Sequence, residues 1–376
     1  MSSGLVTSRR NRRTPYTERV EALGVSGFSI VNHTLLPKSF VKSVEEDYWH
    51  LKEHVQLWDV GCQRQVELRG PDAALLAQKM TPRDLSAMTP GQCYYTPVID
   101  NHAGLLNDPV LLKRAADWFW FSIADSDLLL WTKALALGMN LDIEVCEPDV
   151  WPLAVQGPRA EDLVARIFGD RVRSVRYFSF LECDFHGQRL VVARSGYSKQ
   201  GGFEIYLDDS ELGTTLWDTL WETGIDLQIA PGCPNLIERI EAGLLSYGNE
   251  MTRENNPLEI NLDRFCHFEG QIDYIGRSAL EAIAEQGPSQ RMRGLLIDGV
   301  PCPPCGKPWP VFVDVTRVGQ VTSAIWSPAL RQNVGLSLIN KDHWDPGTPV
   351  TVLLPDGHEL AAVIVSLPFT VPSSAG

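Results

Sequence analysis

The sequence predicts an α+β protein in which two units of similar design are followed by a small β-barrel or β-sandwich. Strand–turn–helix patterns occur twice in the first 220 residues, and a helical pattern follows them. After about residue 290 short apolar runs alternate with turn residues, which is typical of an all-β domain. At 376 residues the chain is long enough for two or three packed domains.

The two units are visible as an internal repeat. VELRGPDAALLAQ (66–78) is similar to LAVQGPRAEDLVA (153–165), and each predicts a strand, a Gly-Pro turn and a helix. FWFSIADSDLLLWTKAL (119–135) and FEIYLDDSELGTTLWDTL (203–220) form a second pair at a nearly equal offset, and each predicts a strand followed by a helix. One duplicated pattern explains both pairs; chance similarity between short apolar segments is the alternative.

The second half of the chain supplies a helix and a domain boundary. Apolar residues repeat at helical spacing in PNLIERIEAGLLSYGNEM (234–251), with Asn235 at the predicted N-cap and Gly248 near the predicted end. EAIAEQGPSQRM (281–292) is interpreted as a linker. We therefore expect a tandem α+β region over 1–285 and a β-domain over 290–376.

Charge and hydropathy exclude several classes of protein. A formal net charge of −14 and a pI of about 5.0 argue against a nucleic-acid or membrane partner. No apolar run of about 18 residues predicts a transmembrane helix. The N-terminus holds four arginines, but the segment after them, TPYTERVEALG, is too polar for an export signal. We expect a basic arm on a cytoplasmic protein.

Cysteine and histidine patterns do not predict a metal site. The eight cysteines are scattered, and the close pair Cys302 and Cys305 lies in a proline-rich turn without a partner pair. Reduced structural thiols are therefore the preferred interpretation. HLKEH, from His50 to His54, matches a zinc-peptidase pattern, but no third ligand is evident and a strand follows at once.

Chemistry-bearing residues occur where strands are predicted. Neither GxGxxG nor GxxxxGK[ST] is present, and the lysine of RSGYSKQGGFEIYL (194–207) precedes the glycines and a strand, so a phosphate loop is disfavoured. Asp108 lies in an apolar run, where an ionised acid needs partners. Four stretches combine such polar residues with apolar patterns: 93–114, 194–207, 239–250 and 256–262.

These stretches carry a resemblance to a known family. WDVGCQRQVELRGPDA, GLLNDPVLL, RSGYSKQGGFEIYL, NPLEINL with DYIGRSAL, and VTSAIWSPALRQNVGLSLI occur in that order between about 55 and 370. In these motifs the chain resembles the folate-dependent aminomethyltransferases, typified by the T-protein of the glycine cleavage system. The resemblance implies two intertwined, ferredoxin-like α+β domains around a folate channel, a C-terminal β-barrel, and tetrahydrofolate as the cofactor.

Within this family the chain is similar to the dimethylsulfoniopropionate demethylases, notably in SKQGG and PGCPNLIERIE. This implies transfer of a methyl group from dimethylsulfoniopropionate to N5 of tetrahydrofolate, giving 5-methyltetrahydrofolate and methylmercaptopropionate. Val31 and Tyr197 depart from the pattern of that subfamily, so another sulfonium or a methylamine is an alternative donor. A non-catalytic folate-binding accessory protein of iron–sulfur assembly is a further alternative, although no Lys-Gly precedes Cys266.

The resemblance also assigns site residues. It aligns Asp108 with the active-site aspartate and Glu204 with the glutamate that holds the pterin. Tyr206 should share a strand face with Glu204, because side chains two positions apart point the same way, and Tyr95 could line the same cavity. Tyr197 is the candidate aromatic face for the substrate cation. For the substrate carboxylate the candidates are Lys199 and Arg194. The expected partner is a small-molecule methyl donor, and a homodimer is left open.

Overall fold

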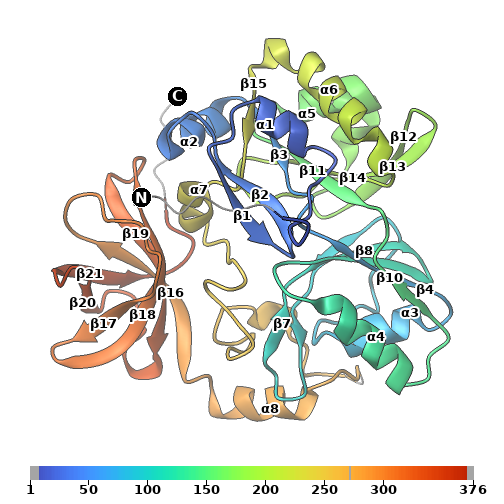
Figure 1. The fold of residues 1–376 in the computed structure, drawn as a ribbon. Helices are drawn as coiled ribbons and strands as arrows, with labels where there is room; N and C mark the ends of the chain where they lie inside the picture. Colours follow the sequence, from blue (N-terminus) through green and yellow to red (C-terminus); the bar gives the residue numbers. More distant parts are fainter. Residues whose placement is uncertain (1–7, 271, 371–376) are drawn as a thin grey trace. The chain divides into compact units, whose positions relative to one another are not determined.

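The protein is described by a computed structural model over residues 8–270 and 272–370 (Figure 1). The chain divides into two compact units, each built from several segments. Unit 1 comprises Met1–Ala77, Leu85–Thr96 and Pro109–Asn235, and unit 2 comprises Gln78–Asp84, Pro97–Asp108 and Leu236–Gly376. No helix in the described ranges is both long enough and apolar enough to cross a membrane.

Unit 1 contains a six-stranded sheet in the order β12-β13-β14-β11-β3-β15. Its strands are β3 (Val55–Asp59), β11 (Trp151–Gln156), β12 (Phe180–Phe185), β13 (Gln188–Ala193), β14 (Gly202–Leu207) and β15 (Ile229–Gly232). Neighbours are antiparallel except for β15, which runs parallel to β3. Helices α5 (Ala160–Phe168) and α6 (Gly213–Thr223) cover one face with a large apolar core (Figure 1).

A second, five-stranded antiparallel sheet completes the framework of unit 1, in the order β10-β4-β9-β8-β5. Its strands are β4 (Gln65–Arg69), β5 (Cys93–Tyr95), β8 (Val110–Ala115), β9 (Trp118–Ser122) and β10 (Glu144–Cys146). The chain also forms helices α3 (Ala73–Lys79) and α4 (Leu128–Gly138) next to these strands in sequence. Side chains of both sheets meet in a smaller apolar cluster that includes Cys93, Trp120 and Tyr206.

The internal repeat predicted from the sequence is present in these elements. Strand β4 leads into α3 as β11 leads into α5, and β9 leads into α4 as β14 leads into α6. Gly70 and Gly157 in the two Gly-Pro turns both have positive φ, and a Cβ atom on either would lie within 3 Å of a backbone oxygen. Both turns therefore require glycine for the same steric reason.

Remaining elements of unit 1 precede β3 in the chain. They are α1 (Thr17–Ala22), β1 (Gly27–Val31), β2 (Thr34–Ser39) and α2 (Val44–Glu53). The predicted basic arm is described from residue 8 onward, and its first seven residues lie outside the described range. Arg12 forms an ion pair with Glu147, and Arg13 forms one with Glu21, so these two arginines are held by carboxylates of the same unit.

Unit 2 contains a closed six-stranded barrel, coloured orange and red in Figure 1. Its strands follow the order β16-β19-β18-β17-β20-β21, with bounds β16 (Gln290–Ile297), β17 (Trp309–Val313), β18 (Thr316–Ser327), β19 (Gln332–Asn340), β20 (Pro349–Leu353) and β21 (Glu359–Val365). The C-terminal β-domain, for which the sequence predicts either a barrel or a sandwich, is therefore a barrel. The rest of the unit includes the hairpin of β6 (Val98–Ile99) and β7 (Leu105–Asn107).

The long helix predicted after Asn235 is wrong in its length. Helix α7 covers only Leu236–Glu241. Gly243 adopts a φ of +66°, and its N–H bonds to the carbonyl of Ile240 while the N–H of Leu244 bonds to that of Arg239. This is a Schellman motif, which ends a helix at a left-handed glycine. The apolar residues that continue the helical spacing beyond Gly243 belong to irregular structure.

The predicted linker over 281–292 is also wrong, because half of it is helical. Helix α8 covers Arg277–Gln286 and buries Leu280. Gly287 has a φ of +75° and follows the helix, and β16 begins at Gln290. The connection itself is therefore three residues long, from 287 to 289.

Candidate active site

Strand β14 places Glu204 and Tyr206 on one face of the six-stranded sheet, as predicted. Phe203 and Ile205 point to the opposite face and join the core under α5 and α6. Tyr206 packs instead in the inter-sheet cluster, 6.3 Å from the ring of Trp120. The alternation of side chains along β14 thus separates the helix-covered core face from the face that carries the predicted site residues.

Small side chains flank Glu204 within the sheet. Ala193 of β13 and Ala154 of β11 are its register partners on either side. The side chains of both end at Cβ, so neither provides a hydrogen-bonding group for the carboxylate. Glu204 is nevertheless only 5% exposed. A buried carboxylate without a cation beside it in the sheet is costly unless hydrogen-bond donors reach it.

One protein donor reaches Glu204 with good geometry. The hydroxyl of Ser195 donates to Glu204 Oε2 at 2.5 Å. Burial raises the pKa of Glu204, and the nearby hydroxyls of Ser195 and Tyr206 lower it in part. Burial and the charge of Glu204 also raise the pKa of Tyr206 well above its ordinary value, so this phenol stays protonated and can donate.

The Tyr206 hydroxyl lies near Glu204 and Ser122 but has no protein hydrogen-bond partner of good geometry among the described residues. A buried carboxylate and a buried phenol therefore share one face of the sheet, with acceptor and donor capacity left over. Reduced pterin has a row of N–H donors along one edge. This set of side chains fits that edge in chemical type.

Tyr95 belongs to the other sheet of unit 1. It is the last residue of β5 and shares a strand face with Cys93. Cys93 packs in the cluster that contains Tyr206, and the charge of Glu204 helps to raise the pKa of its thiol, after burial. The structure therefore brings β5, which carries Tyr95, against the strand that carries Glu204 and Tyr206.

Tyr197 lies in the turn between β13 and β14 and is half-buried. It packs against Leu51, Trp58, Val60 and Ala154. Since Ala154 is also the register partner of Glu204, Tyr197 and Glu204 adjoin the same alanine. Lys199, two residues further along the turn, is exposed.

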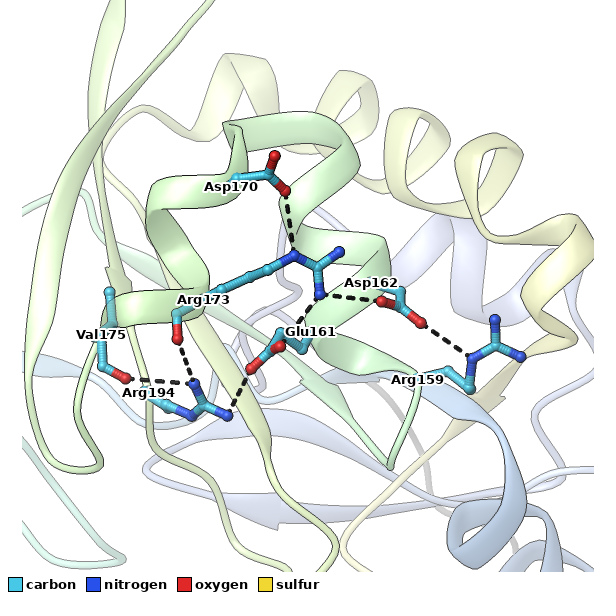
Figure 2. A network of polar contacts seen from close by, with 7 residues as sticks. All are labelled: Arg159, Glu161, Asp162, Asp170, Arg173, Val175 and Arg194. Atoms are coloured by element: carbon cyan, nitrogen blue, oxygen red, sulfur yellow. Dashed lines mark hydrogen bonds and ion pairs between the residues drawn. The ribbon is translucent and has the colours of Figure 1, made fainter.

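Arg194 faces away from this surface, contrary to one of the two predictions for the substrate carboxylate. Figure 2 shows its guanidinium turned toward α5, where Nη2 pairs with Glu161 at 2.7 Å and Nη1 donates to the carbonyls of Arg173 and Val175. It also lies over the ring of Phe203, on the helix-covered side of the sheet. Arg194 is a structural residue here, and the prediction for it is wrong.

Asp108 belongs to unit 2, where it is the last residue of the segment that carries the β6–β7 hairpin. It is 8% exposed and lies between the buried residues Asn107 and Pro109. Its burial is consistent with its position in an apolar run of the sequence. Its predicted approach to the same ligand as Glu204 stays a prediction.

Sequence reasoning missed the polar residues that support the site. Ser195 lies within the motif RSGYSKQGGFEIYL, in which only its contact with Glu204 marks it as a site residue. Ser122 and Gln156 come from distant strands, and Gln156 bonds to the carbonyl of Ser195 across 39 positions. No local pattern marks such contacts, because they depend on how the strands pair.

Metal ligation has no support in the described residues, which contain no group of three His, Cys, Asp or Glu side chains able to hold an ion. His50 Nε2 lies 2.9 Å from the carbonyl oxygen of Gln228, and burial lowers the pKa of His50 to about 4. The eight cysteines are all free thiols.

Family models match both parts of the chain. The GCVT N-terminal domain matches residues 16–270, and the glycine cleavage T-protein C-terminal barrel domain matches residues 290–370. The chain belongs to the glycine cleavage T-protein family. Two curated members of this family illustrate the range of similarity.

Dimethylsulfoniopropionate demethylase DmdA of Ruegeria pomeroyi is 52% identical over 355 residues, covering 94% of this chain and 96% of that protein. An aminomethyltransferase of Caldanaerobacter subterraneus is 29% identical over 341 residues, covering 89% of each chain. The crystal structure of glycine cleavage system aminomethyltransferase T from Bartonella henselae matches 96% of this chain with a TM-score of 0.86 at 24% identity. This last likeness confirms the predicted α+β fold with its C-terminal barrel.

Proposed function

We propose that the protein is a tetrahydrofolate-dependent demethylase that transfers a methyl group from dimethylsulfoniopropionate to N5 of tetrahydrofolate. The products are 5-methyltetrahydrofolate, methylmercaptopropionate and the proton that N5 releases. The observation that carries this proposal is the 52% identity to DmdA over nearly the whole of both chains. The buried carboxylate and phenol on β14 support it, because they suit a pterin edge.

The reaction requires alignment of the reacting atoms and does not require strong acid catalysis. The sulfonium is already a good leaving group, and bound tetrahydrofolate supplies the nucleophilic nitrogen. The chain must hold nitrogen, methyl and sulfur in line at roughly 3–3.5 Å and exclude water. Asp108 is proposed as the catalytic residue that positions the reacting side of the pterin and stabilises charge there.

Glu204 and Tyr206 are the proposed grip on the cofactor, together with Tyr95 and Asp108. A carboxylate can accept two neighbouring N–H bonds. In a buried setting such charge-assisted bonds are worth about 1.5–3 kcal/mol. The Tyr206 phenol adds a donor on the same strand face. This division leaves the turn between β13 and β14 for the methyl donor.

Tyr197 is the proposed face for the sulfonium cation. A cation over an aromatic ring gains about 0.5–2 kcal/mol, more as water is excluded, and Tyr197 is half-buried against apolar neighbours. Lys199 is proposed to meet the substrate carboxylate. Its exposure is compatible with a group that closes on the substrate from the turn.

A panel of methyl donors tests this assignment. Dimethylsulfoniopropionate, a second sulfonium and a methylamine are each incubated with tetrahydrofolate, and 5-methyltetrahydrofolate is quantified. We expect the first to be the best donor. If another donor is preferred, tetrahydrofolate-dependent methyl transfer stands but the proposed substrate is wrong. If none gives product although tetrahydrofolate binds, the accessory-protein alternative is favoured.

Finer statements about organisation belong to the same proposal. We propose that residues 1–285 bind the folate and that residues 290–376 form a separate barrel domain. A reducing, cytoplasmic location suits eight free thiols. No nucleic-acid or membrane partner is proposed, in keeping with the net charge of −14.

A homodimer is also proposed, with α4 as its contact. Leu130 and Leu137 are 64% and 84% exposed, and Lys133 is the one charged side chain of this helix. Exposed apolar side chains with so little charge are typical of an interface. Sedimentation should show a dimer that Leu137→Lys weakens; a monomeric wild-type protein would contradict this.

A further inference from the structure

We infer that Gln156 is a positioning residue that fixes the turn between β13 and β14 and thereby aligns the methyl donor with the cofactor. The turn covers residues 194–201 and carries Tyr197 and Lys199. The inference deepens the proposed function and rests on it. Gln156 itself would touch neither substrate nor cofactor.

A single side chain contacts the start and the middle of the turn and the strand that follows it. Gln156 Nε2 donates to the carbonyl of Ser195 at 3.2 Å and lies 3.4 Å from that of Phe203. Its Oε1 accepts from the hydroxyl of Ser198 at 2.8 Å. Gln156 is fully buried, so water does not compete for these bonds.

Gly196 in the turn and Gly202 at the start of β14 both pack closely against this amide. A Cβ atom at Gly196 would lie 2.2 Å from both Oε1 and Nε2 of Gln156, and one at Gly202 would lie 2.7 Å from Nε2. Both glycines have positive φ. The backbone therefore wraps the amide so closely that only glycine fits at either position.

The bonds of Gln156 connect the two halves of the candidate site. Ser195, whose carbonyl is held by Gln156, donates its hydroxyl to Glu204. Phe203 precedes Glu204 on β14, and Ser198 follows Tyr197. Fixing these backbone positions sets the distance between the proposed cation face and the proposed pterin grip, which methyl transfer requires within a fraction of an ångström.

An amide is required because the position needs donors and an acceptor together. A carboxylate has no N–H for the carbonyls of Ser195 and Phe203, and it would repel both. A protonated carboxyl restores one donor. The variant Gln156→Glu keeps the shape of the side chain and changes only this property.

Asn333 offers a matched control in the barrel. It is also fully buried, and it bridges a loop by accepting from the N–H of Cys302 at 2.8 Å and donating to the carbonyl of Val300 at 2.9 Å. Asn333→Asp makes the same chemical change on β19, beside a loop that carries none of the proposed site residues.

The test compares both variants with the wild type. For Gln156→Glu we expect kcat/KM for dimethylsulfoniopropionate to fall roughly 10- to 100-fold at pH 8, and the loss relative to wild type to shrink as the pH is lowered and the carboxyl gains a proton. Hydrogen exchange of the amides over 195–203 should quicken without any ligand. Asn333→Asp should do neither.

Three outcomes are separable. If the wild type transfers no methyl group, the proposed function fails. If the wild type is active and Gln156→Glu keeps its kinetics and exchange within about twofold, or if Asn333→Asp loses as much activity, the positioning role is wrong. Should Gln156→Glu not fold, Ser198→Ala removes only the bond to Oε1; we expect a rise in KM of several-fold, and an unchanged KM would overturn the inference.

Discussion

Glu204 is a carboxylate whose surroundings in the protein supply too few donors for its charge. Burial raises its pKa, Ser195 provides one hydrogen bond, and its neighbours in the sheet are alanines. A ligand with adjacent N–H groups would complete its hydrogen bonding. Burying this charge destabilises the folded protein, and hydrogen bonds from such a ligand would offset that cost.

Replacing Glu204 by alanine should weaken tetrahydrofolate binding by about tenfold or more, because about 1.5–3 kcal/mol of charge-assisted bonding is lost. Titration calorimetry measures the affinity directly. Glu211→Ala, at an exposed acid after the same strand, is the control and should leave the affinity unchanged. An unaltered affinity in Glu204→Ala would remove this residue from the site.

For single residues, the sequence predicts correctly which side chains share one face of a strand. Glu204 and Tyr206 are two positions apart, so their common face follows from local geometry. Ser195, Ser122 and Gln156 could not be predicted, because their contacts arise from the pairing of β11, β13 and β14 and from the approach of the second sheet. Arg194 was misjudged because the strand it follows turns it toward the helices.

At the scale of elements, the junction between the β13–β14 turn and β14 is constrained by close packing. Gly201 and Gly202 are adjacent and both have positive φ. A Cβ at Gly202 would lie 2.3 Å from the carbonyl oxygen of Val155, whereas one at Gly201 would meet no atom within 4 Å. Substitutions at these two glycines therefore distinguish the effect of a steric clash from the effect of backbone strain alone.

Gly202→Ala should lower the free energy of unfolding by about 2–4 kcal/mol, since it adds a backbone clash to the strain of positive φ. Gly201→Ala should cost about 1 kcal/mol, because only the strain applies. Urea unfolding of both variants provides the comparison. Equal losses in the two would show that the backbone of the turn yields, contrary to the close packing described.

Element boundaries were predicted where the deciding signal is local. The strand–turn–helix repeats were predictable because Gly-Pro turns follow apolar strands. Helix α7 was predicted too long because apolar spacing continues past Gly243, and only the left-handed φ of that glycine ends the helix. Residues 281–286 were predicted as part of a linker but form the end of helix α8, and the Gly-Pro pair at 287–288 marks the actual connection.

For the whole molecule, a buried acid outside the site links stability to pH. Asp59 is fully enclosed at the end of β3, and burial raises its pKa to about 7, although bonds from Thr14 and Gly61 oppose the rise. Between about pH 4 and pH 7 the folded state keeps a proton that the unfolded state has already released. Stability from this group therefore falls as the pH rises through that window.

Asp59→Asn should remove this dependence. Asparagine can accept from the N–H of Gly61 and donate to Thr14, so the fold is kept. From about pH 5 to pH 8 the wild type should lose about 2–3 kcal/mol of stability relative to the variant. Denaturant unfolding at both pH values measures the difference. A constant difference would mean that Asp59 is ionised throughout.

The fold class of the whole chain was predictable because its duplicated α+β pattern and its run of short strands are each visible in the sequence. The division into compact units was less accessible. Segments 78–84 and 97–108 are grouped with the C-terminal part of the chain, a long-range association that no local pattern indicates. Asp108 lies in one of these segments.

The central claim is methyl transfer from a sulfonium to tetrahydrofolate, and isotope tracing tests it most directly. The purified protein is incubated with S-methyl-¹³C dimethylsulfoniopropionate and tetrahydrofolate, and the label is followed by NMR. We predict that ¹³C appears at the N5-methyl of 5-methyltetrahydrofolate, with methylmercaptopropionate formed in equal amount. Label that remains on sulfur, or that leaves as dimethyl sulfide without any 5-methyltetrahydrofolate, would contradict the account.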